Sequence, residues 1–145
     1  MKKIIALLPL LLLLSLTNLY AMDHWEILLN NKVIFKGKIG EENPTLKFKS
    51  RSFKTTDRFT LKYTADDPQK DWNRIFIVTD AQDKELKTVY LDKQSVQVSV
   101  KASEVKLLMN KKQPVFIYTT SLPKDPAKAA TVRVRRILLC KVEWN

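Results

Sequence analysis

The chain from residue 22 onward consists of short runs in which apolar and polar residues alternate. The clearest run is residues 57–64, where Phe59, Leu61 and Tyr63 alternate with polar side chains. Such alternation is typical of a β-strand with one buried side and one solvent-facing side. Apolar residues at helical spacing are nearly absent, so the pattern predicts an all-β domain.

Turn residues separate these runs at intervals of about ten residues. Asn30 and Asn31 predict a two-residue hairpin turn, because asparagine tolerates a positive φ. Residues 72–79 are apolar on both faces, which predicts a central strand covered on both sides. The predicted strands are residues 24–29, 32–36, 45–50, 57–64, 72–79, 84–91, 96–100, 115–120 and 131–144.

One short helix is predicted after the strand at 96–100. Ser103 suits its N-terminal cap, Glu104 suits the positive end of the helix dipole, and Asn110 suits its end. Residues 126–130 allow one further helical turn. The last run changes phase, which predicts a bulge near Arg136.

Together these elements predict a single antiparallel β-sandwich or jelly roll in residues 22–145. It has about eight or nine strands and one short helix.

Residues 1–21 read as a secretory signal peptide. Lys2 and Lys3 give a positive start, an apolar run rich in leucine follows, and Ala21 is a small residue suited to cleavage before Met22. An uncleaved anchor is the alternative, since residues 4–22 carry no charge. The cleaved form predicts export to the periplasm or the extracellular space, with no transmembrane span left in the mature chain.

Net charge adds a constraint on partners. The chain of 145 residues has 26 lysines and arginines and 15 acidic residues. Without residues 1–21 the balance is 24 against 15, a net charge of +9. This excess favours an anionic glycan, a lipid headgroup or an acidic protein as partner. Alternatively, the charge serves only solubility.

The alternating strands place four cations on their polar faces. These are Lys47, Lys49, Arg58 and Lys62, which we expect to form one anion-binding face if their strands are neighbours. A merely solvated face is the alternative. Nucleic acid is disfavoured, because single-strand binding needs stacking aromatics among the cations and only Phe53 lies there.

Catalytic chemistry has little support in the sequence. His24 is the only histidine and Cys140 the only cysteine, so a nucleophile–base triad and a zinc site are disfavoured and an internal disulfide is excluded. Cys140 lies in an apolar run and is expected to be buried. No cofactor or metal site is predicted.

Two other features remain open. The acidic residues lie mostly in predicted turns, where they normally accept local hydrogen bonds, although two facing carboxylates would suit glycoside cleavage. Trp25, Trp72 and Trp144 border apolar strands, which favours packing over sugar stacking.

Three segments resemble small exported all-β proteins of unknown function from Gram-negative bacteria: residues 25–31, 118–126 and 133–140. The resemblance implies a sandwich fold and export, and it assigns no functional residue.

The sequence therefore favours a non-catalytic binding or envelope-associated module. A small glycan-processing enzyme on the same fold and an oligomeric structural protein remain as alternatives.

Overall fold

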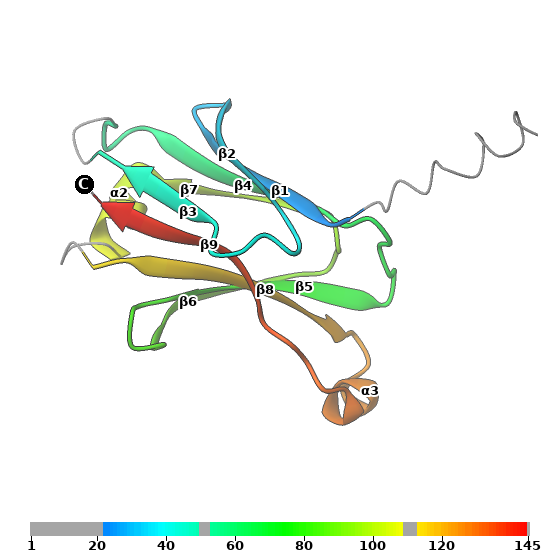
Figure 1. Ribbon diagram of the computed structural model, residues 1–145. Helices are drawn as coiled ribbons and strands as arrows, with labels where there is room; N and C mark the ends of the chain where they lie inside the picture. Colours follow the sequence, from blue (N-terminus) through cyan, green and yellow to red (C-terminus); the bar gives the residue numbers. More distant parts are fainter. Residues whose placement is uncertain (1–21, 50–52, 109–112, 145) are drawn as a thin grey trace, which may run out of the picture.

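Two β-sheets pack face to face around the core (Figure 1). The computed structural model describes residues 22–49, 53–108 and 113–144, so the predicted signal peptide lies outside the described residues. Sheet A has the strand order β2-β1-β4-β7, and sheet B has the order β3-β9-β8-β5-β6. The elements are β1 (His24–Leu29), β2 (Lys32–Lys38), β3 (Thr45–Phe48), β4 (Arg58–Thr64), β5 (Trp72–Thr79), β6 (Glu85–Leu91), β7 (Val96–Lys101), α2 (Ala102–Leu108), β8 (Val115–Pro123), α3 (Pro126–Thr131) and β9 (Ile137–Trp144). The predicted all-β class is confirmed.

Strand pairing follows the alternation in the sequence. In β3, Leu46 and Phe48 are buried while Lys47 is exposed, and in β7 the valines point inward between exposed polar residues. Neighbouring strands pair antiparallel except β3 and β9, which run parallel. This one parallel pair departs from the antiparallel expectation, because β3 joins the sheet opposite to that of β2 and β4.

The prediction of a doubly covered central strand is confirmed for β5. It lies between β8 and β6, and Ile75, Phe76 and Ile77 are all buried. Phe76 faces the second sheet, where it packs in the core with Tyr63 of β4.

The last predicted strand is shorter than expected. Residues 126–131 form α3, with Asp125 accepting a hydrogen bond from the amide of Ala127 (2.9 Å) and Pro126 in the first turn. β9 begins only at Ile137.

The predicted bulge near Arg136 is wrong in position. Arg136 precedes β9, and its guanidinium lies over the ring of Tyr118, 4.5 Å from the centroid. The irregularity falls instead at Leu139, between paired Leu138 and Cys140. It allows Leu139 and Cys140, which are adjacent in the chain, to be fully buried together.

The two long edges of the sandwich differ. On one edge β2 contacts β9, so the sheets approach each other there. The other edge is formed by β6 and β7, which line a cavity between the sheets. In the part of the chain that the structure describes, no helix is long and apolar enough to span a bilayer.

Candidate functional site

The four predicted site cations lie on two different sheets. Lys47 is in β3 of sheet B, and Lys49 follows directly after that strand. Arg58 and Lys62 are in β4 of sheet A. All four are exposed, but Leu46 and Phe48 fill the core from β3, so Lys47 points away from sheet A. The four residues therefore do not share one sheet face.

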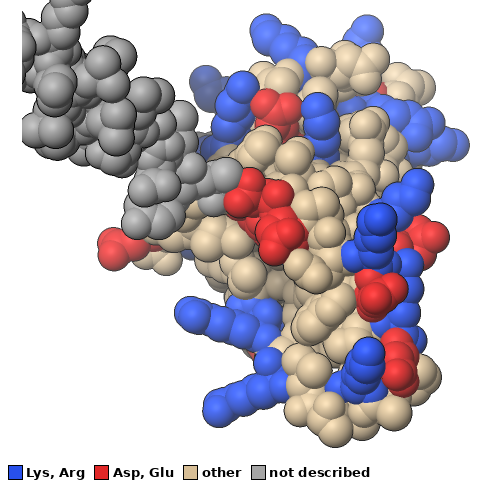
Figure 2. All heavy atoms as spheres, turned by 90° about the vertical axis from the view of Figure 1, so that its right-hand side faces the viewer, with Lys and Arg blue, Asp and Glu red and all other residues tan. Residues whose placement is uncertain are grey.

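A different set of cations shares a face with Arg58 and Lys62. The outer face of sheet A carries five cations and one carboxylate, Glu26. In Figure 2, lysine and arginine side chains project from the upper part of the molecule, the side on which sheet A lies in Figure 1. We call this set the basic face: Lys36, Lys38, Arg58, Lys62 and Lys101.

Glu26 neutralises part of the basic face. It stands between Lys36 and Lys62 in one row across three strands. Lys36 Nζ lies 3.0 Å from its carboxylate. The hydrogen bond from Lys36, helped by the charge of Lys62, lowers the pKa of Glu26 below its usual value. Lys36 is thus paired with Glu26, and the other four cations give this face a net positive charge.

Two cations of the basic face meet at the first residue of β4. Arg58 and Lys101 stand directly opposite each other in the β4–β7 ladder. Like charges in this position disfavour strand pairing. Neither forms an ion pair with a carboxylate among the described residues. The sequence alone does not place Lys101, Lys36 and Lys38 on this face; alternation puts them on polar faces, but only the strand order brings them beside Arg58.

Lys47 lies beside an ion pair on sheet B. Glu143 stands opposite it in the β3–β9 ladder and forms an ion pair with Lys141 (2.5 Å). The hydrogen bond from Lys141 lowers the pKa of Glu143, and the charge of Lys47 adds to this effect. Lys47 thus lies next to a carboxylate that is already paired, as Lys62 lies next to Glu26.

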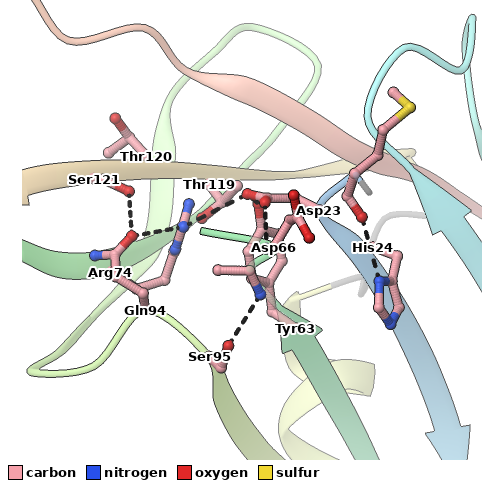
Figure 3. Close-up of polar contacts among 12 residues, drawn as sticks. Asp23, His24, Tyr63, Asp66, Arg74, Gln94, Ser95, Thr119, Thr120 and Ser121 are labelled. Carbon is pink, nitrogen blue, oxygen red and sulfur yellow. Dashed lines mark hydrogen bonds and ion pairs between the residues drawn. The ribbon is translucent and has the colours of Figure 1, made fainter. Parts of the chain in front are cut away.

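A buried polar cluster joins the two sheets at one end of the sandwich (Figure 3). Arg74 of β5 is buried, and its guanidinium lies 4.3 Å from the ring centroid of Tyr63 in β4. Arg74 donates to Gln94 Oε1 (2.8 Å) and lies 3.8 Å from Asp23, while the Tyr63 hydroxyl donates to Asp23 (2.5 Å). Ser121 of β8 donates to the same Gln94 oxygen (3.1 Å).

This cluster holds parts of the fold together. Burial, with the hydrogen bond to Asp23, raises the pKa of Tyr63, so the phenol stays protonated. Arg74 Nε and Gln94 Nε2 make no hydrogen bond to a described atom, but both are buried. The cluster links Asp23, which precedes β1, to β4, β5 and β8, and we call it the arginine clamp.

The residues considered for catalysis lie apart. His24 is exposed on the outer side of β1, and Cys140 is buried in the core. Burial raises the pKa of Cys140 to about 12, so its sulfur is a thiol and a poor nucleophile at neutral pH. Among the described residues, no three His, Cys, Asp or Glu side chains are grouped to hold a metal ion.

Neither Trp25 nor the cavity between the sheets provides a sugar site among the described residues. Trp25 is buried and stacks against Tyr63, with ring centroids 6.3 Å apart. The cavity between the sheets is lined by a single carboxylate, Glu104, among the described residues. Glycoside cleavage requires two carboxylates facing one another, and this cavity does not supply the second.

Comparison with known proteins adds no family: no family model matches the chain, and no curated protein matches its sequence.

Proposed function

We propose that the protein is an exported, non-catalytic binding module that docks on an anionic lipid surface through the basic face of sheet A. The observation that carries the proposal is the direct opposition of Arg58 and Lys101 on a face with five cations and one carboxylate. A like-charge pair costs stability in the free protein, and negative charge brought to it by a partner offsets that cost.

The apolar residues on the same face favour lipid over the other anionic partners. Val33 and Leu28 stand opposite each other in the β1–β2 ladder, and Leu28 also stands opposite Thr60. Val33 is 37% exposed. This row lies between the row of Lys36 and Lys62 and the end that carries Arg58. Cations around a small apolar strip suit the boundary between phosphate headgroups and acyl chains.

Export is part of the proposal and rests on the predicted signal peptide. Fractionation of a Gram-negative host that expresses the full chain, followed by N-terminal sequencing, tests it. A mature chain that begins at Met22 is expected, and a retained N-terminus would contradict cleavage.

The docking test uses the four sequence-predicted cations, because the fold divides them into matched halves. Binding to vesicles of phosphatidylglycerol and phosphatidylcholine is measured for R58Q/K62Q and for K47Q/K49Q. Each double variant removes the same charge, from a different sheet. At about 1 kcal/mol for each cation near an anionic surface, R58Q/K62Q is expected to bind about thirtyfold more weakly. K47Q/K49Q should stay close to the unmodified protein.

Two results would contradict the docking face. Equal losses in both double variants would mean that only net charge matters. Binding that does not weaken between about 0.05 M and 0.5 M salt would exclude an electrostatic contact. Tighter retention on an anionic polysaccharide than on the vesicles would replace the lipid with a glycan as partner.

A further inference from the structure

A second candidate site lies inside the sandwich and is independent of the basic face. It is a cavity of about 130 Å³ between the two sheets. Its walls are apolar side chains from both sheets and from α2, including Val98 and Val100 of β7, Val89 of β6 and Val105 of α2.

Valine is the most frequent residue in the walls of the cavity. Seven valines line the cavity, and valine is too short to fill the distance of about 10 Å between packed sheets. Protein interiors are otherwise packed closely, so an apolar space of this size is uncommon. Apolar cavities of roughly 150 Å³ take up small hydrocarbons of the size of benzene.

The mouth of the cavity carries charge. Lys87 of β6 and Glu104 of α2 both line the cavity, and their side chains are 37% and 50% exposed. Lys87 Nζ lies 3.1 Å from Glu104 Oε2, so an ion pair connects the edge of sheet B to the helix that follows sheet A. Exposed ion pairs of this kind contribute little net stability, so the pair opens at low cost.

We propose that this cavity binds the hydrocarbon end of a medium-chain monocarboxylate, with the carboxylate of the ligand replacing Glu104 as the partner of Lys87. The apolar walls take the chain, and Lys87 is the cation at the mouth that fits its head. Binding is non-covalent, and displacement of Glu104 from Lys87 frees α2 to move away from β6.

The test follows the valine methyl groups by ¹³C NMR while the purified protein is titrated with octanoate or with octan-1-ol. Octanoate is expected to shift the methyl resonances of Val89, Val98, Val100 and Val105. The variant V98F fills the cavity and should abolish these shifts, whereas V134F, the same change at an exposed valine between α3 and β9, should keep them. If V98F does not fold, competition by toluene for the same methyl shifts in the unmodified protein replaces it.

The head group is tested by K87Q, with K93Q in the exposed β6–β7 turn as the matched control. K87Q should weaken octanoate about tenfold, the size of one lost charge-assisted contact, and leave octanol within about twofold. Absent methyl shifts, or shifts that persist in V98F or resist toluene, would overturn the cavity site. Equal effects of K87Q on octanoate and octanol would overturn the carboxylate assignment.

Discussion

At the scale of single residues, the contact between Gly37 and Trp25 constrains the packing of sheet A most tightly. The two residues stand opposite each other in the β1–β2 ladder. The indole of Trp25 is 1% exposed and crosses the backbone at Gly37. A Cβ placed on Gly37 would lie 2.5 Å from Trp25 Cε2 and Nε1. Only glycine leaves room for the indole ring there.

Gly37→Ala is therefore expected to lower the free energy of unfolding by about 1–3 kcal/mol, the usual cost of overpacking. Urea denaturation measures this as a lower midpoint with an unchanged slope. In a Trp25→Phe background the smaller ring leaves space, so the added methyl should cost less. Equal costs in both backgrounds would show that the indole is not the obstacle.

Cys140 gives the folded state a pH dependence in the alkaline range. Burial raises its pKa to about 12, while the unfolded thiol has a pKa of about 8.5. Above pH 8.5 the unfolded chain loses this proton and the folded chain keeps it, so the folded state becomes less stable as pH rises. Below that pH the contribution is constant.

Between pH 9 and 12, the free energy of unfolding is expected to fall by up to about 1.4 kcal/mol per pH unit through this group. Cys140→Ala removes the group, so the stability difference between the unmodified protein and the variant should shrink from pH 8 to pH 10. Tyr63, whose pKa is also raised by burial, adds to the fall at higher pH in both proteins. A difference that stays constant would contradict a buried, protonated thiol.

At the scale of elements, the β1–β2 hairpin shows two asparagines with separate roles. Both have positive φ, 48° at Asn30 and 68° at Asn31, as a two-residue hairpin turn requires. Asn30 also donates to Asp57 (2.8 Å) and accepts from the amide of Arg58 (2.9 Å). Asn31 makes no such contact among the described residues, so it stabilises the turn only by adopting a positive φ.

Asn31→Gly is expected to raise the free energy of unfolding by a few tenths of a kcal/mol, because glycine adopts positive φ without strain. Asn30→Gly should lower it by about 1 kcal/mol or more, because the contacts with Asp57 and Arg58 are lost. Thermal unfolding of the two variants measures the contrast. Opposite signs at adjacent positions are the expected result, and a shared sign would contradict the division of roles.

The elements that sequence analysis predicted well are those with a local signal. Alternation in 57–64 and the Asn30–Asn31 turn depend on neighbouring residues, and both are confirmed. The end of the chain was predicted less well. Residues 132–136 also alternate, but they form a connection before β9, in which Arg136 contacts Tyr118 and Asp83. Alternation alone does not distinguish a strand from a connection that lies across a sheet.

At the scale of the whole molecule, the position of β3 limited the prediction of the candidate site. Lys47 and Arg58 have the same pattern in their strands, yet β3 pairs with β9 and β4 pairs with β1. These pairings join residues far apart in the chain, and no local feature of the sequence specifies them. The sequence therefore identified Arg58 and Lys62 but could not supply Lys101, their neighbour on the basic face.

The arginine clamp connects the two layers, since its members come from both sheets and from Asp23, which precedes β1. Arg74→Met keeps much of the side-chain volume but leaves Gln94 and Asp23 without their cationic partner. Breaking a buried charged pair usually costs about 3–5 kcal/mol. The side chain of Asp23 is 22% exposed, so we expect the free energy of unfolding to fall by about 3 kcal/mol. Urea denaturation measures this change.

The matched control is Arg58→Met, which makes the same substitution on the exposed basic face and should change stability by no more than about 0.5 kcal/mol. Asp23→Asn combined with Arg74→Met should cost less than the sum of the single variants, because both remove the same contact. A loss in Arg74→Met no larger than in Arg58→Met would mean that the apolar core alone holds the sheets together. The expected large difference would show that one buried cation connects the segment before β1 to both layers.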